Sequence, residues 1–379
     1  MYNINNIKIK LIDESVNRLE DISDEEYFKG LEFSGYISNS SMALINPSQG
    51  GSPTKFLTGF SNKKSGGALE LGSAVHRMIL EKDQYYIDEL DKPSEKVCNV
   101  MDYYHDFVIN DTPHEEAIKE ACIRADYYAK NLTQTRIDNV LRDGQAYLNQ
   151  LIDKQNCTNC IVLTREHKDK LDRCLISIKN NKNITNLIEG ATSENFQNHN
   201  EDVIIMKVKA EVPSEEVDNF SDVEQELFLK VKIDNWTIDF ENKIVTLNDL
   251  KTTSGSIADF CGGETENMNL SGEVYTSRQQ GSFEKFHYYR QMAFYMRVLK
   301  AYVATTYDAT EDNGWTFKCN MLVVETNEPH YSHVFEVGPR WLSLGTYEYE
   351  SLLKRIAYHK VHGYDSFINI KINGTTVIW

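Results

Sequence analysis

Two segments in the middle of the chain alternate between apolar and polar residues, as β-strands with one buried face do. Residues 232–240 read Lys-Ile-Asp-Asn-Trp-Thr-Ile-Asp-Phe, and residues 244–253 read Ile-Val-Thr-Leu-Asn-Asp-Leu-Lys-Thr-Thr. Only Glu241-Asn242-Lys243 separates them, a polar stretch that is short enough for a tight turn. This pattern predicts a β-hairpin.

The predicted turn allows two registers that differ by one residue. In the first register Asp234 lies opposite Asp249, with Cβ atoms roughly 5 Å apart. In the second register Asp234 lies opposite Leu250. Asp249 and Lys251 share one face in both, because side chains on a strand repeat every two residues. The hairpin therefore gathers two carboxylates and an ammonium group, unless it is simply a surface hairpin with scattered charges.

Helical periodicity dominates much of the remaining chain. Residues 68–82 place Leu71, Val75, Met78 and Ile79 on one apolar face at the spacing of a helix. Other helices are predicted over 113–190, 284–302 and 341–360. Strands are predicted to resume near Val203 and to include 316–325 and 331–337. Strands mixed with helices in this order predict an α/β fold.

The predicted organisation is one domain preceded by a lead-in. Residues 1–37 form an acidic N-terminal lead-in, and residues 38–379 form a single domain. A helical insertion is expected at about 90–200. Residues 255–282 are rich in Gly, Ser and Asn, which favours a mobile loop.

Composition narrows the class of protein. The chain is 41% hydrophobic, which is ample for a core, and it lacks any apolar run of the ~18 residues that a membrane span needs. The N-terminal residues show no secretory signal, and seven cysteines without framework spacing fit a reducing compartment. We therefore expect a cytoplasmic protein without a membrane partner. Cys157 and Cys160 form a lone Cys-x-x-Cys pair, a weak indication of zinc.

The formal charge of −17 works against a nucleic-acid partner, since a polyanion is repelled at long range. The acids cluster, however, in residues 13–27, 200–226 and 307–312. A local basic face is predicted on the helix at 284–302, which carries the following cations, with Arg278 just before them: Lys285, Arg290, Arg297 and Lys300.

Three helical side chains complete the candidate chemistry. His76 follows Gly72 by one turn, which leaves space beside an imidazole that can bind a transition metal such as Mn²⁺. Gln291 and Tyr295 are also one turn apart and can hydrogen-bond a phosphate, a bound water or a base edge. A simpler explanation exists in both cases. His76 would then be an ordinary buried histidine, and Gln291 and Tyr295 would be part of an ordinary amphipathic helix.

In order along the chain, these signals are Gly-x-x-x-His, an Asp on a first strand, Asp-x-Lys on the next strand, and Gln-x-x-x-Tyr on a helix. This succession resembles the RecB/RecE-type exonuclease branch of the PD-(D/E)XK nuclease superfamily. The resemblance covers about 38–80, 160–255 and 283–360. It includes the segment from Ser38 to Leu44, and the run from Val323 to Tyr331 with the closing helix.

The resemblance implies an α/β, restriction-endonuclease-like core, in which helices flank a central mixed β-sheet, with a helical insertion. It also implies a role for each residue. His76, Asp234, Asp249 and the Leu250 carbonyl would bind one or two Mg²⁺ or Mn²⁺ ions. Lys251 would orient or deprotonate the attacking water. The residues implied to steady the DNA strand and the waters are Gln291 and Tyr295. Many members carry a further glutamate on the preceding strand, for which the candidates here are Glu211 first and Glu226 second.

The implied function is hydrolysis of DNA phosphodiester bonds. The preferred form is an exonuclease that acts at duplex ends in recombination or repair, in a phage or a bacterium. Two alternatives stay open: an endonuclease of the same superfamily, and a catalytically inactive, nuclease-like interaction module. No iron–sulfur cluster is expected, because the C-terminal half offers only Cys261 and Cys319. No nucleotide-binding Gly-x-x-x-x-Gly-Lys-Ser/Thr loop is present, so a helicase or annealing partner would be a separate chain. A homo-oligomer is possible.

Overall fold

The predicted hairpin is present, and it adopts the first of the two registers. The computed structural model describes residues 9–20, 22–59, 67–81, 86–89, 93–156, 160–190, 192–213, 222–268, 271, 273–364, 371–372 and 375–376. Strands β5 (Val223–Asp239) and β6 (Ile244–Thr253) are antiparallel, with Asn235 opposite Asn248. The Asp239 carboxylate closes the turn, since it accepts the backbone N–H groups of Glu241 and Asn242 at 3.1 and 2.9 Å.

The hairpin forms the middle of a six-stranded mixed sheet with the strand order β1-β4-β5-β6-β9-β10. The other four strands are β1 (Lys10–Leu19), β4 (Phe196–Val212), β9 (Thr316–Glu325) and β10 (Ser332–Glu336). β6 and β9 are parallel, and the other neighbours in this sheet are antiparallel. Helices flank the sheet, so the predicted α/β class with a mixed central sheet is confirmed.

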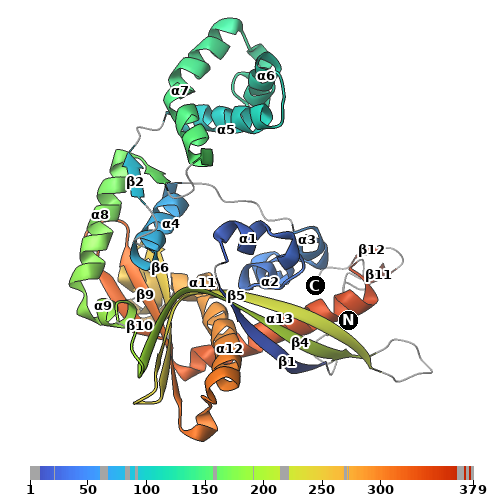
Figure 1. The fold of residues 1–379 in the computed structure, drawn as a ribbon, viewed down its shortest axis with the longest axis vertical. Coiled ribbons are helices and arrows are strands. Elements are labelled where there is room, and N and C mark those ends of the chain that lie inside the picture. Colours follow the sequence, from blue (N-terminus) through green and yellow to red (C-terminus); the bar gives the residue numbers. More distant parts are fainter. Residues whose placement is uncertain are drawn as a thin grey trace. The chain divides into compact units, whose positions relative to one another are not determined.

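The two longest helices of this part of the chain pack together and against the sheet. α12 (Tyr288–Tyr307) and α13 (Pro339–His362) contact each other, and both contact β4 and β5 (Figure 1). Gly345 permits the close approach, because a Cβ there would lie 2.2 Å from the Tyr289 carbonyl oxygen. Their buried side chains join Leu229, Val231 and Trp236 of β5 in one core.

Shorter helices complete the same part of the chain. They are α1 (Asp24–Lys29), α2 (Asn39–Ile45), α3 (Pro53–Thr58), α9 (Lys182–Ile188), α10 (Ile257–Cys261) and α11 (Ser282–Lys285). Single 3-10 turns lie at Leu31–Phe33, Pro47–Gln49 and Glu311–Asn313. α9 contacts β5 and β10, and α2 contacts α12 and α13.

The chain divides into two compact units. The first comprises residues 1–64 and 177–379 and holds the six-stranded sheet; the second comprises residues 65–176. The second unit contains α4 (Gly67–Leu80), β2 (Tyr86–Glu89), α5 (Glu95–Ile109), α6 (His114–Arg124), the 3-10 turn Ala129–Asn131, α7 (Gln134–Asn156) and β3 (Cys160–Leu163). α8 (Arg165–Asn180) spans the division. Helices α5, α6 and α7 pack around their own apolar core (Figure 1).

Two segments contain more regular structure than the sequence indicated. The lead-in supplies β1, an edge strand that pairs with β4, and α1. Residues 255–282 contain α10 and a ribbon of β7 (Gly262–Met268) with β8 (Val274–Gln280). Backbone pairing stabilises this ribbon whatever its side chains, which is why Gly and Ser content gave no sign of it. The mobility of this segment and the single-domain description stay predictions.

Strands β11 (Lys371–Ile372) and β12 (Thr375–Thr376) form a separate short ribbon. Within the described ranges, no helix is both long enough and apolar enough to cross a bilayer.

Candidate metal centre

Asp249 lies at the centre of a contact between three of the residues that the sequence singled out. Its carboxylate is buried, with 1% of the residue exposed. The Gln291 side-chain N–H donates to Asp249 Oδ1 at 2.7 Å, and the Lys251 ammonium pairs with Asp249 Oδ2. Packing of α12 against the sheet places Gln291 there, and the two-residue period of β6 places Lys251 there.

Lys251 is held in its charged form. Burial alone lowers the pKa of an ammonium, but the charges of Asp249 and Asp234 outweigh it and raise the pKa of Lys251 above its ordinary value. Lys251 Nζ also lies 5.4 Å from the centre of the Tyr288 ring. This side chain is therefore a charged hydrogen-bond donor.

Tyr295 faces the same group of charges from the next turn of α12. Its burial raises the pKa of the phenol well above the ordinary value, and the charges of Asp249 and Asp234 act in the same direction. A hydrogen bond with Gln291 favours the opposite direction but does not prevail. The phenol is thus neutral and can donate a hydrogen bond to an oxygen.

Asp234 lies where the pairing of β5 and β6 gives way to side-chain contacts. The last backbone pair before it is Asn235 with Asn248. One residue further, Asp234 Oδ2 accepts the backbone N–H of Leu250 at 2.8 Å. This bond keeps the Asp234 carboxylate beside the Asp-x-Lys segment and orients the Leu250 peptide group.

Glu201 is a third acid of the site, and the sequence did not single it out. It lies on β4 between the pairs Asn200–Asn235 and Asp202–Ile233, which places it opposite Asp234. A carboxylate oxygen of Glu201 lies within 4.8 Å of one from Asp234. Its φ of 54° is a left-handed conformation that interrupts the regular strand at this residue.

Lys232 neutralises part of this negative charge. Its Nζ pairs with Glu201 Oε2 at 2.6 Å and with Asp24 of α1 at 2.5 Å. Burial opposes the charged form of Lys232, but the two acids raise the pKa of Lys232 above its ordinary value. In the first unit, Lys232 is therefore a flanking cation on the Glu201 side of the Glu201–Asp234 pair.

The choice of Glu211 as the further acid was wrong. Glu211 pairs with Lys10 of β1 and Glu224 of β5, whereas Asp234 lies beside Glu201. Because a strand rises about 3.3 Å per residue, positions 201 and 211 are on the order of 30 Å apart. Glu226, the second choice, pairs with Lys209 and forms an ion pair with Lys207.

The error has a physical origin. The segment that joins β4 to β5 is long and acidic, so the sequence did not fix which residue of β4 faces Asp234. The rule that paired positions keep a constant sum could have identified Glu201, but only with the ends of both strands known.

His76 lies on α4 in the second unit and is half-buried. Its place beside the acids of the first unit stays a prediction. The Cys157–Cys160 pair falls outside the residues whose side chains the structure describes.

The predicted basic face of the 284–302 helix is largely neutralised by acids. Arg290 is buried, with 1% exposed, and donates to Glu348 at 2.9 Å. Arg297 pairs with Asp13, and Lys300 pairs with Glu311. Just before the helix, Arg278 likewise pairs with Glu284. The sequence could not reveal the partners of Arg290 and Arg297, because Glu348 and Asp13 are distant from them along the chain.

The donor set of the first unit fits a hard divalent cation. Glu201 and Asp234 bring carboxylate oxygens within 4.8 Å of each other, and the peptide group of Leu250 is held beside Asp234. Asp249 offers a further carboxylate, whose charge acts together with that of Asp234 on Lys251. Mg²⁺ and Mn²⁺ prefer oxygen ligands of this kind. The arrangement can hold a cation next to one ammonium donor and two neutral polar donors.

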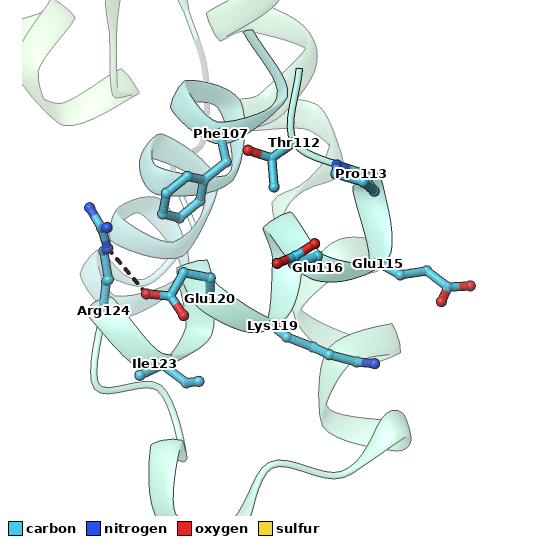
Figure 2. A pocket seen from close by; sticks show the side chains of 9 residues that line it. All are labelled: Phe107, Thr112, Pro113, Glu115, Glu116, Lys119, Glu120, Ile123 and Arg124. Carbon is cyan, nitrogen blue, oxygen red and sulfur yellow. Dashed lines mark hydrogen bonds and ion pairs between the residues drawn. The ribbon is translucent and has the colours of Figure 1, made fainter. Parts of the chain in front are cut away.

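A separate cavity in the second unit, of about 670 Å³, contains none of the residues that the sequence singled out (Figure 2). Helix α6 forms most of its wall, with Phe107, Thr112 and Pro113 completing it. Its three glutamates are balanced in part by two cations, one of which, Arg124, pairs with Glu120 at 3.4 Å.

Comparison with known proteins finds no matching family model and no matching curated protein. Among solved structures, the chain is similar to the crystal structure of "Putative exonuclease" from Eubacterium rectale, with a TM-score of 0.42 and 11% identity. That alignment covers 90% of this chain and 87% of the other. The case for a function therefore rests on the geometry of the site.

Proposed function

We propose that this protein is a metal-dependent DNA nuclease of the PD-(D/E)XK superfamily, and that it acts as an exonuclease on DNA ends in recombination or repair. The observation that carries the proposal is the meeting of Gln291, Asp249 and Lys251, which come from a helix and a strand far apart in sequence. If Lys251 and Asp249 formed only a structural salt bridge, the second pair of acids, Asp234 and Glu201, would have no role in it. A site that binds a divalent cation gives these acids a role.

The proposed ligands are Asp234, Asp249, Glu201 and the Leu250 carbonyl, with His76 completing the set from the second unit. When bound, Mg²⁺ or Mn²⁺ supplies charge neutralisation at the phosphate and a more acidic water. The identity and number of the ions are part of the proposal.

The remaining residues donate hydrogen bonds and orient the ligands. Lys251, charged beside Asp249, donates hydrogen bonds to an oxygen of the phosphate or of the attacking water. Gln291 fixes the orientation of the Asp249 carboxylate through its bond to Oδ1. Tyr295, a neutral phenol, donates to the same group of oxygens.

DNA is the proposed substrate even though the chain carries a charge of −17. Because the cations of α12 are already paired, affinity for the phosphate comes mainly from the site, and binding depends on the divalent cation. A cytoplasmic location, and an annealing protein or helicase as a separate partner, belong to the same proposal.

A cleavage assay tests the proposal. Purified protein is incubated with end-labelled linear duplex and with a covalently closed circle, in Mg²⁺, Mn²⁺ or chelator. We expect the linear duplex to be degraded only with a divalent cation, and not by the Asp249→Ala or Lys251→Ala variants. Glu211→Ala is the matched control, since this acid lies far from the site. Activity in chelator, or equal activity of Asp249→Ala, contradicts the proposal.

The closed circle separates the two enzymatic possibilities. An exonuclease leaves it intact, whereas an endonuclease of the same superfamily linearises it.

A catalytically inactive interaction module is a second candidate, favoured by the paired cations on α12 and by the overall negative charge. Titration with Mn²⁺ distinguishes this candidate, because an inactive module lacks binding that depends on Asp234 and Asp249.

A further inference from the structure

A row of asparagines crosses four neighbouring strands of the sheet. Asn200 of β4 lies opposite Asn235 of β5, which lies opposite Asn248 of β6, which lies opposite Asn320 of β9. Their side chains form a continuous chain of hydrogen bonds. Asn320 donates to Asn248 Oδ1 at 2.9 Å, Asn248 donates to Asn235 Oδ1 at 2.7 Å, and Asn235 donates to Asn200 Oδ1 at 2.7 Å.

The asparagine row is buried except at its β4 end. Asn235 and Asn248 are 1% and 0% exposed, and Asn320 is 7% exposed. The row is also tied to a helix end. Asn235 donates to Asn198 Oδ1 at 2.7 Å, and Asn198 donates in turn to the carbonyls of Ile188 and Gly190.

Such a row contributes more to register than to stability. A buried amide costs free energy unless its donors and acceptors are satisfied. Here Asn235 and Asn248 are satisfied by the amides on the facing strands, and any other register would leave them unpaired. A slip by one residue would also move every side chain of the strand to the opposite face.

Each of the three acids of the candidate site is next in sequence to a member of the row. Glu201 follows Asn200, Asp234 precedes Asn235, and Asp249 follows Asn248. The row is also the last paired rung of β5 and β6 before Asp234 turns to the Leu250 N–H.

From this juxtaposition we propose that the asparagine row positions the metal centre, by fixing the register of β4, β5, β6 and β9 directly beside Glu201, Asp234 and Asp249. Asn235 and Asn248 are the central positioning residues, and Asn320 is an outer one. The inference rests on the proposed function only in taking the three acids as cation ligands.

Asn248→Leu tests this role, because leucine has a similar volume but cannot pair with Asn235 or Asn320. The matched control is Thr246→Val. Thr246 is buried on the same face of β6, two residues away, opposite Thr237. Both variants alter a buried polar side chain, but only Asn248 adjoins the acids. Asn320→Leu removes one rung and keeps the bond between Asn235 and Asn248.

Two measurements are made on each variant and on wild type: Mn²⁺ affinity by calorimetry, and urea unfolding followed by tryptophan fluorescence. We expect Asn248→Leu to weaken Mn²⁺ binding by about 10- to 100-fold, as loss of a residue that orients a ligand does. Thr246→Val should bind Mn²⁺ as wild type does, and Asn320→Leu should fall between them.

Equal Mn²⁺ affinity in Asn248→Leu and wild type, or an equal loss in Thr246→Val, overturns the positioning role. If Asn248→Leu does not fold, Asn320→Leu and Thr246→Val decide by the same comparison. Failure of the proposed function gives a different result, since wild type and Asp249→Asn would then show the same Mn²⁺ titration.

Discussion

Replacement of Gly345 by alanine should destabilise the first unit by a predictable amount. The added Cβ would lie 2.2 Å from the carbonyl oxygen of Tyr289 and 2.7 Å from the Cβ of Ala293. Ordinary contact begins at 3.4 Å, and the closest atom is backbone, which cannot rotate away. Helices α12 and α13 must therefore separate by about 1 Å, an overpacking strain of the kind that costs about 1–3 kcal/mol.

Alanine also has a gain to set against this strain. In the interior of a helix it is more favourable than glycine by about 1 kcal/mol. The clash should be near the upper end of its range, because it involves the backbone of a buried helix. We expect the free energy of unfolding to fall by about 1–2 kcal/mol after both effects.

Urea unfolding followed by tryptophan fluorescence measures this change. Residues 65–176 contain no tryptophan, so the signal does not report on the second unit. Trp341 packs against Tyr289, with ring centres 5.5 Å apart, and so responds close to the substitution. Gly338→Ala is the control, because a Cβ there meets nothing within 4 Å. If Gly345→Ala is as stable as wild type, the packing of α12 on α13 described above is incorrect.

Three further predictions concern the site and a buried ion network. Gln291→Leu should keep the fold but lower the cleavage rate by about 10- to 100-fold, because Asp249 loses the donor that orients it; unchanged kcat would exclude this role. Glu201→Gln should weaken Mn²⁺ binding measured by calorimetry, whereas Glu211→Gln should not, and equal effects would restore the original choice of acid. Glu348 is half-buried, and burial alone raises the pKa of its carboxyl group, but hydrogen bonds from His287 and Tyr289 and the positive charge of Arg290 lower the pKa overall. The stability from this group is present above the pKa of the unfolded chain, about 4.3, and is lost as pH falls through the lower folded value. Below about pH 4.3, the free energy of unfolding should therefore fall more steeply with falling pH in wild type than in Glu348→Gln. Identical pH profiles of stability in the two proteins would refute this linkage.

The hairpin could be predicted because its signals are local. Alternation over two strands and a short polar turn limited the register to two choices. The helical stripe of Gln291 and Tyr295 was also local, and Gln291 does reach Asp249. The sequence could not supply the distance between Gln291 and Asp249, because that distance depends on how α12 packs against the sheet.

Glu201 was missed because its identification needs a long-range register. The strand pairing on either side of Glu201 keeps one register, and only that register places Glu201 opposite Asp234. The basic face failed for a related reason. Arg290 is a cation in the sequence, but its partner Glu348 lies on another helix, and Arg290 is buried in that ion pair rather than exposed on a surface for DNA.

The asparagine row was invisible for a third reason. Single asparagines in strands are unfavourable residues that mark turns in most sequences. Asn235, Asn248 and Asn320 acquire their meaning only when three strands are placed side by side.

The most direct test of the central claim is a crystal structure of the protein grown with Mn²⁺, in which anomalous scattering locates the ion. The account predicts an anomalous peak within coordination distance of carboxylate oxygens from Asp234 and Asp249, with Glu201 beside it, and loss of that peak in Asp249→Asn. A peak elsewhere, or none at these carboxylates under saturating Mn²⁺, would contradict the account.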